Sequence, residues 1–209
     1  RNARFVAVCA TVLLMSAVFF SVLLYVPQFL TKVLHFSPLE AGAGLLPMML
    51  LYACVSFAAG PLYNRLGPKI VVSAGSLLMA VGMGLLSRLD AGDQFSALVP
   101  GLAILGVGVG LFYSSVTTAG VTALDASRSS LAGGIVYMCQ IAGGSIGLGL
   151  NTAIVTGEVE TDPGGLVDGI ASAFTLDAGL AAAGLLVAVL FVGGRLGRRG
   201  APASEGASA

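Results

Sequence analysis

Six apolar stretches, each long enough to cross a membrane, dominate this chain of 209 residues. They run from about 5 to 30, 37 to 62, 69 to 87, 95 to 120, 130 to 156 and 170 to 194. A helix needs about 20 apolar residues to span the roughly 30 Å hydrocarbon core of a bilayer. Within that core, helices satisfy their own backbone hydrogen bonds. The sequence therefore predicts an all-α membrane protein with six transmembrane helices.

Composition supports this class and argues against others. Hydrophobic residues make up 56% of the chain and charged residues only 10%, whereas a soluble domain carries about 25% charged residues. The expected environment of so apolar a chain is therefore the lipid bilayer. The net charge is zero, which gives no sign of a nucleic-acid partner. No cluster of His, Asp and Glu marks a membrane enzyme, and no cofactor or metal site is expected. Cys9, Cys54 and Cys139 lie in apolar stretches without a C-x-x-C pair and are interpreted as small hydrophobic residues.

The cations predict an orientation. With a cytoplasmic N-terminus, only Lys32 and Arg88 fall outside. The inside segments then hold eight cations: Arg1, Arg4, Arg65, Lys69, Arg128, Arg195, Arg198 and Arg199. This follows the positive-inside rule, and the loop 157–169 carries four acids and no cation, which suits the outside. We expect a multi-pass protein of the plasma (inner) membrane with both ends of this segment cytoplasmic and a disordered tail at 195–209.

The stretch 60–69, with the sequence G-P-L-Y-N-R-L-G-P-K, separates the second and third apolar runs. It is predicted to be a hairpin loop in which glycine and proline break one helix and start the next. On the residues alone, a generic positively charged connector and a dedicated gating loop fit equally well. The gating-loop candidates are Gly60, Asn64, Arg65, Gly67 and Lys69.

Polar residues are unequally distributed among the predicted helices. The first, second, fourth and fifth carry more of them than the third and sixth. Polar side chains are costly in lipid, so they are expected to face protein or a water-filled cavity. Four helices around a cavity, with the third and sixth as lipid-facing supports, is the simplest arrangement. The candidates for the cavity wall are Gln28, Tyr113, Tyr137, Gln140 and Asn151.

Glycine spacing predicts where helices approach closely. Gly106 and Gly110 in the fourth helix, and Gly143 and Gly147 in the fifth, have the G-x-x-x-G spacing that lets helix backbones meet. Gln140 lies on or beside the same face as Gly143, so it fits either a substrate wall or a packing seam.

The acidic residues receive structural interpretations. Glu40 with Ser37 has the pattern of a capping box, with proline at the first helical position. Asp177 is expected one or two turns below the outer surface, where interaction with the helix dipole is favoured over proton binding. No acidic residue is expected in the middle of any span.

Three motifs, in order and on the expected helices, carry a family resemblance. The stretch 60–69 is similar to G-x-L-x-D-R-x-G-x-K, 37–42 with Leu46-Pro47 is similar to S-P-x-x-A-G…L-P, and 140–147 is similar to Q-x-x-G-G-x-x-G. The chain resembles the C-terminal six-helix half of a major facilitator superfamily transporter, closest to the fourteen-helix drug:proton antiporters. It departs from the pattern at Asn64, which stands where the family has a carboxylate.

The resemblance implies a function and a partner. We expect a secondary active transporter, not an enzyme, that exports small apolar or amphipathic compounds by proton coupling. A six-helix half cannot alternate access alone, so the partner is an absent N-terminal half, which is also expected to hold the coupling carboxylate. The alternatives are transport of a sugar or metabolite by the same fold, and a truncated membrane protein that does not transport.

Overall fold

The computed structural model describes residues 3–89, 92, 94–122, 128–161 and 165–192. These residues form helices joined by short connections, and no strand occurs among them. The elements are α1 (Ala3–Lys32), α2 (Pro38–Ala43), α3 (Leu46–Leu66), α4 (Pro68–Leu86), α5 (Phe95–Val121), α6 (Ser129–Thr161), α7 (Leu166–Val187) and the π-helical turn η2 (Ala188–Val192). Within the described part of the chain, 6 helical segments are long and apolar enough to cross a membrane. The predicted all-α class with six transmembrane helices is confirmed.

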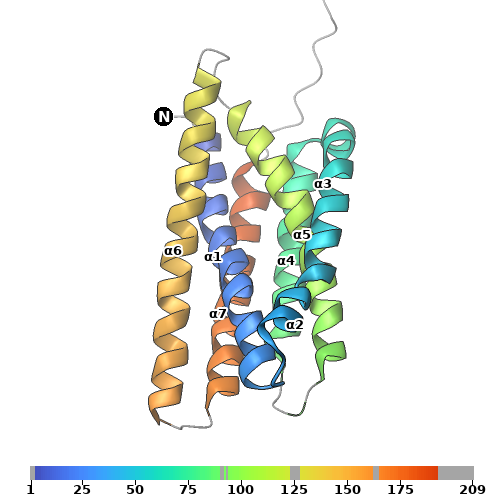
Figure 1. Ribbon diagram of the computed structural model, residues 1–209. Coiled ribbons are helices and arrows are strands. Elements are labelled where there is room, and N and C mark those ends of the chain that lie inside the picture. The colour runs from blue at the N-terminus through green and yellow to red at the C-terminus, as the bar shows by residue number, and fades with distance from the viewer. Residues whose placement is uncertain (1–2, 90–91, 93, 123–127, 162–164, 193–209) are drawn as a thin grey trace, which may run out of the picture.

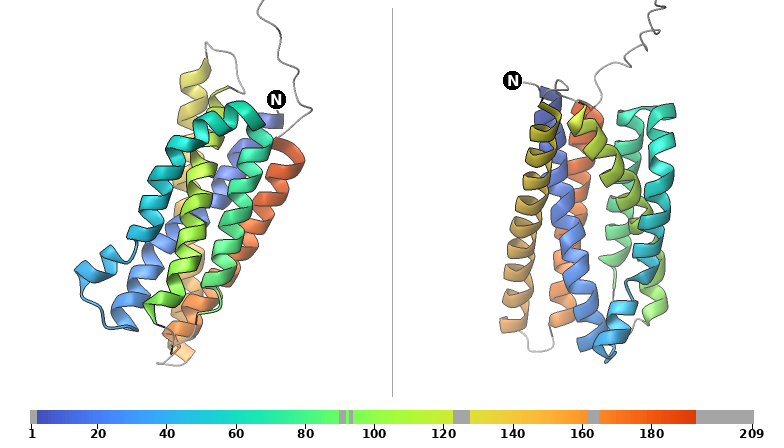
Figure 2. Two further views of the ribbon diagram at one scale, coloured as in Figure 1. Left: turned by 90° about the vertical axis from the view of Figure 1, so that its right-hand side faces the viewer. Right: turned by 45° about the horizontal axis from the view of Figure 1, so that its top comes forward.

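The helices form an elongated bundle of two groups. Helices α1, α6 and α7 pack together, as do α3, α4 and α5, and α4 also packs on α7. Figure 1 looks onto the face made by α6, α1, α5 and α3, with α4 and α7 behind it. From the side, the left view of Figure 2 shows α3, α5, α4 and α7 following one another across the bundle. The third and sixth membrane helices thus lie together at one side of the bundle; their contact with lipid stays a prediction.

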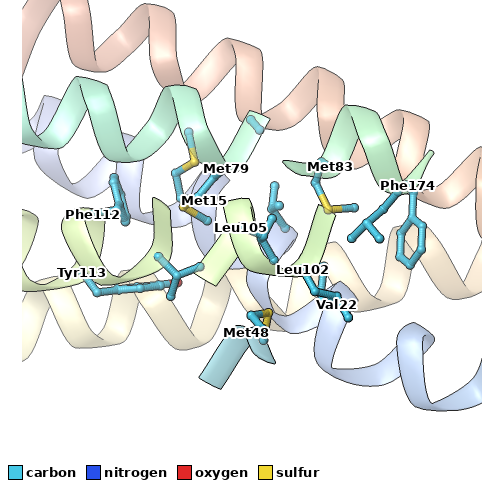
Figure 3. Close-up of a cluster of buried hydrophobic side chains, with 14 of the residues drawn as sticks. Met15, Val22, Met48, Met79, Met83, Leu102, Leu105, Phe112, Tyr113 and Phe174 are labelled. Atoms are coloured by element: carbon cyan, nitrogen blue, oxygen red, sulfur yellow. The ribbon is translucent and has the colours of Figure 1, made fainter. Parts of the chain in front are cut away.

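The centre of the bundle is packed with methionine, leucine and phenylalanine side chains. Met15, Met48, Met79 and Met83, from α1, α3 and α4, are fully buried and converge there (Figure 3). Unbranched, polarisable methionine fills irregular gaps between helices. This core holds the two groups of helices together.

Helices α4 and α5 approach each other at paired glycines. A Cβ on Gly75 would lie 2.7 Å from the backbone nitrogen of Phe112, and a Cβ on Gly108 would lie 2.7 Å from that of Met79. Side chains at these positions would force the two backbones apart, so glycine sets the helix separation.

The connection between α3 and α4 is much shorter than predicted. Helix α3 continues through Pro61 to Leu66, and α4 begins at Pro68. The prediction of a hairpin loop over 60–69 was therefore wrong in extent, because proline inside a membrane helix does not have to end it. The only non-helical residue between α3 and α4 is Gly67, with φ 85° and ψ 163°, a conformation that essentially only glycine adopts.

The start of the second membrane segment follows the predicted cap. The Ser37 hydroxyl accepts from the Glu40 backbone N–H, while the Glu40 carboxylate accepts from the Ser37 backbone N–H at 2.9 Å. The capping box is thus confirmed. The segment is not one helix, however, since it breaks after α2 and restarts at Leu46 with Pro47 in the first turn of α3.

Helices α6 and α7 both extend beyond their predicted ends. Helix α6 reaches Thr161 instead of ending near 156, and α7 begins at Leu166 instead of 170. Glutamate is a good helix former, so Glu158 and Glu160 continue α6 past the apolar stretch. Asp168 lies in the first turn of α7, where a negative charge interacts favourably with the helix dipole.

Candidate functional site

A pocket of about 550 Å³ lies between α1, the second half of α6 and the start of α7. Its polar side chains are Tyr25, Gln28 and Lys32 from α1 and Thr152 and Thr156 from α6. On each helix these residues are three or four positions apart and so share one face. The remaining wall is apolar and consists of Leu24, Val155, Val159 and Leu166. The pocket therefore offers hydrogen bonds, one positive charge and an apolar surface together.

A hydrogen bond between two hydroxyl groups lies in the wall of this pocket. The Tyr25 and Thr152 hydroxyls lie 2.9 Å apart and join α1 to α6. Tyr25 is buried, whereas Lys32 and Leu166 mark the last residue of α1 and the first of α7. The pocket thus runs from the helix ends inward to the Tyr25–Thr152 pair.

A buried polar cluster lies next to this inner end. The side-chain amide of Asn151 donates to the Ser21 hydroxyl at 2.7 Å and to the two carboxylate oxygens of Asp177 at 3.0 and 2.9 Å. All three side chains have 0% exposure. Ser21 lies one helical turn before Tyr25, and Asn151 directly precedes Thr152. The cluster joins α1, α6 and α7 beside the pocket.

The position of Asp177 corrects two predictions. It is the twelfth residue of α7, within a membrane segment that runs for 27 residues from Leu166 to Val192, and lies about 16 Å from the helix start at 1.5 Å per residue. The influence of a helix dipole is confined to the first turn. The dipole interpretation was therefore wrong, as was the statement that no acidic residue lies in the middle of a span. The earlier start of α7 places Asp177 deeper than the apolar pattern predicted.

The five predicted cavity residues do not come together in one site. Gln28 lines the pocket and Asn151 lies in the buried cluster beside it. Tyr137 is 62% exposed and Gln140 half-buried on α6, and Gln140 is 11 residues, about 16 Å, from Asn151 along that helix. Their roles as substrate contacts stay predictions.

Tyr113 lies apart from the pocket, in the core between α1 and α5. It is 8% exposed, and its hydroxyl is 2.9 Å from that of Ser16. Its ring packs edge-on against Phe19 and Phe112, with centroid separations of 5.5 and 5.3 Å. Tyr113 thus connects α1 to α5, and its role as a cavity residue stays a prediction.

The predicted glycine pairs face neighbouring helices. Gly143 and Gly147 lie against the backbone of Leu13 and against Ala17 on α1. Gly106 lies against the Met48 backbone of α3, and Gly110 against the Tyr52 carbonyl and Val55 of the same helix. These positions leave no room for a side chain without movement of α1 or α3.

The gating-loop candidates gather where α3 meets α4, at the end of the bundle away from the pocket mouth (Figure 1). Gly60, Asn64, Arg65 and Lys69 are exposed. Among the described residues, Gly67 is the only glycine with a positive φ. A role for these residues in gating stays a prediction.

Pairing of the polar side chains was not foreseen from the sequence. The first helix carries Ser21 and Tyr25, four residues apart, and the fifth carries the adjacent residues Asn151 and Thr152. These two polar pairs are the signal that could have linked the two helices. The missing information was the depth of Asp177, which depends on where α7 begins.

The chain belongs to the Major Facilitator Superfamily, since the model of that family matches residues 8–208. It is 31% identical over 148 residues to "Multidrug resistance protein B homolog" of Mycobacterium tuberculosis, a match that covers 70% of this chain and 27% of that protein. It is 32% identical over 148 residues to "Multidrug resistance protein Stp" of the same organism, with 70% and 27% covered. It is 26% identical over 201 residues to "Puromycin resistance protein pur8" of Streptomyces alboniger, with 91% and 40% covered.

These matches confirm the family resemblance drawn from the three motifs. The chain spans about a quarter to two fifths of the length of these relatives. Together with the 6 membrane-length helices of the described residues, they identify a multi-pass membrane protein of a transporter family.

Proposed function

We propose that this chain is the C-terminal six-helix half of a proton-coupled exporter of small apolar or amphipathic compounds. The observation that carries the proposal is the pocket between α1 and α6, in which Gln28, Tyr25 and Lys32 stand beside an apolar wall. A lining of this kind holds compounds that have both apolar and hydrogen-bonding parts. The names of the relatives, which refer to multidrug and puromycin resistance, support the substrate class.

An N-terminal half is part of this proposal. Helix α3 is the least buried of the membrane helices described, and it exposes Leu50 by 61% and Phe57 by 85%. In this family two halves rock about a site between them. We infer that the face made by α6, α1, α5 and α3 in Figure 1 meets the other half, which leaves α4 and α7 toward lipid.

The proposed orientation places both ends of this segment in the cytoplasm of a cell with a plasma (inner) membrane. Arg65, Lys69 and Arg128 lie at the bundle end where α1 begins. The opposite end carries Lys32 and Arg88 with the described acids Glu40, Glu158, Glu160 and Asp168. An excess of Lys and Arg favours the cytoplasmic side. The pocket then opens toward the outside, where an exporter releases its substrate.

The test uses the full-length transporter that contains this chain, purified and reconstituted in lipid vesicles. Ethidium serves as an amphipathic substrate and glucose as a control solute. We expect ethidium transport driven by a pH gradient and abolished by a protonophore. Gln28→Ala should change the relative transport of ethidium and a second compound such as puromycin, whereas Thr175→Ala, an exposed change on α7 outside the pocket lining, should not. Glucose transport without ethidium transport would contradict the proposal.

A further inference from the structure

We propose that the carboxyl group of Asp177 binds a proton that enters from the pocket through the Tyr25–Thr152 hydroxyl pair. This inference rests on the proposed export function and places a proton site in this half of the transporter. It assigns a task to a buried acid that neither the helix cap nor the packing of α7 explains.

The first argument is the cost of the charge. An ionised carboxylate in the middle of a membrane helix is expensive unless a cation or several hydrogen-bond donors compensate it. The Asp177 carboxyl receives the amide of Asn151 and faces the Ser21 hydroxyl. Both partners are neutral, so they stabilise the negative charge only in part. A carboxyl in these surroundings gains from binding a proton.

The charged groups of the surrounding helices are remote from the cluster. Helix α7 packs against α1, α4, α6 and η2. Apart from Asp177, the titratable side chains of these elements from residue 5 to 160 and from 165 to 192 are Cys9, Tyr25, Lys32, Lys69, Tyr137, Cys139, Glu158, Glu160 and Asp168. Lys32, Lys69, Glu160 and Asp168 lie in the first or last turn of their helices, and Glu158 lies two turns beyond Asn151. Of this set, Tyr25 is within one turn of Ser21.

The second argument is an acceptor without a donor. The side-chain oxygen of Asn151 is buried and has no hydrogen-bond partner, although such groups are nearly always satisfied in proteins. The amide nitrogen already serves Ser21 and both oxygens of Asp177. The cluster is thus one hydrogen short. A protonated Asp177 supplies a hydroxyl that can donate to the Asn151 oxygen while its other oxygen accepts from the Asn151 nitrogen.

The third argument is a route. The wall of the pocket holds the Tyr25 and Thr152 hydroxyls, which lie 2.9 Å apart. Tyr25 lies one turn from Ser21 on α1, and Thr152 directly follows Asn151 on α6. Hydroxyl groups both donate and accept hydrogen bonds, so this pair can exchange a proton with water in the pocket at a point one helical turn from the cluster.

The donor set favours a proton over a metal ion. Hard metal cations surround themselves with about six oxygen ligands. Here both oxygens of Asp177 and the oxygen of Ser21 already accept from the Asn151 amide. A proton needs only one oxygen to bind and one to receive its hydrogen bond.

Protonation of Asp177 has a structural consequence for the pocket. Protonation changes the hydrogen bonds between Asp177 of α7 and Asn151 of α6. The residue after Asn151 on α6 is Thr152, which lines the pocket. Proton binding and pocket shape are therefore linked through a single helix segment, which is the requirement for coupling the proton to a substrate.

The direct test is pH-difference infrared spectroscopy of the full-length transporter in vesicles. We expect a C=O stretching band of a buried carboxylic acid to appear on acidification and to be lost in Asp177→Asn. Asp168→Asn, an exposed acid of the same helix, is the matched control and should keep the band. A band unchanged in Asp177→Asn, or one that responds to Na⁺ at constant pH but not to pH, would overturn the proposal.

A second measurement needs no substitution at the cluster. Dicyclohexylcarbodiimide reacts with protonated carboxyl groups in apolar surroundings, and mass spectrometry of peptides locates the adduct. We expect the yield at Asp177 in the wild-type protein to fall at least tenfold from acidic to alkaline pH. The same yield at both would contradict proton binding there.

Transport separates this inference from the proposed function. If the wild-type transporter moves no ethidium under a pH gradient, the export proposal fails, but the infrared band and the adduct still report on Asp177. If wild-type transport is proton-driven and Asp177→Asn still accumulates ethidium against its gradient, the coupling role of Asp177 is refuted. The expected result is loss of uphill transport with retained exchange of ethidium down its gradient.

Discussion

At the scale of single residues, hydrogen bonds between helices align the bundle more than they hold it together. Ser16 with Tyr113 joins α1 to α5, and Tyr25 with Thr152 joins α1 to α6. Such bonds contribute on average only about 0.6 kcal/mol each in a membrane protein. Each requires a particular rotation and depth of its helix, however. Their main effect is thus to select one arrangement of the helices, because the apolar side chains on the rest of the helix surfaces could pack in several ways.

Gly67 offers a test of backbone conformation at the α3–α4 connection. Gly67→Ala should lower the thermal stability of the purified transporter, because a non-glycine residue in its conformation costs about 1–3 kcal/mol. Gly60→Ala is the control, since Gly60 is helical and a Cβ there meets nothing within 4 Å. The melting temperature in detergent, followed by fluorescence-detected size-exclusion chromatography, distinguishes the two. Equal melting temperatures would show that α3 and α4 can be joined without this conformation.

Gln140 tests whether the α6 face beyond the pocket contacts substrate. If it does, Gln140→Ala should change which compounds are exported while the amount of folded transporter stays near that of the wild type. A packing role gives the opposite pattern, with less folded protein and a uniform decrease in export. Export assays with several compounds, normalised to the amount of folded protein, decide between the two.

At the scale of helices, the α1–α6 seam is built on small residues. Gly143 and Gly147 of α6 contact the α1 backbone directly. In the same way, Gly106 of α5 contacts the backbone of α3. Backbones that approach this closely gain many van der Waals contacts, which replace the hydrophobic effect as the driving force inside a bilayer. Because α6 and α1 also form the pocket walls, the seam sets the pocket width.

A single methyl group tests this seam. Gly143→Ala places a Cβ onto the Leu13 carbonyl, whereas Gly149→Ala on the same helix meets nothing within 4 Å. Overpacking costs about 1–3 kcal/mol, so we expect the first variant to reduce the yield of folded transporter several-fold and the second to leave it unchanged. Yields are compared by in-gel fluorescence and size-exclusion chromatography. A normal yield for Gly143→Ala would mean that α1 shifts without penalty.

The number and class of the helices could be predicted because hydropathy depends on composition alone. Their ends could not, since Pro61 is tolerated inside α3, and Glu158 and Glu160 continue α6 into a polar stretch. The site was found only in part. Gln28 and Asn151 were selected as polar residues in apolar surroundings, but the partner of Asn151 depends on the depth and rotation of α7. That depth follows from the start of the helix at Leu166, which the apolar pattern does not contain.

At the scale of the whole molecule, charge differs between the two ends of the bundle. Among the described residues, Arg65, Lys69 and Arg128 lie at one end, which holds no described acid, and the described acids lie near the other end or, for Asp177, inside. This asymmetry predicts the orientation of the entire transporter half in its membrane.

Labelling of single cysteines tests this orientation. In a background without Cys9, Cys54 and Cys139, a cysteine at Asp168 should react with a membrane-impermeant maleimide in intact cells, and one at Arg65 should react only after permeabilisation. Both positions are exposed, so the difference reports the side of the membrane. Reaction of the Arg65 position in intact cells would invert the predicted topology.

The buried acid of α7 also bears on how the protein is made. An aspartate at the centre of a membrane helix opposes insertion by about 2.5–3.5 kcal/mol, while the remaining apolar residues of this segment favour it. When α7 leaves the insertion machinery, lipid provides no hydrogen-bond partner for the Asp177 carboxyl group. The helices α1 and α6, which are made earlier, carry the hydrogen-bonding side chains of Ser21 and Asn151. Hydrogen bonding to these two residues favours packing of the nascent helix against α1 and α6. We therefore expect Asp177 to guide the docking of α7 during biosynthesis, before any compound is transported.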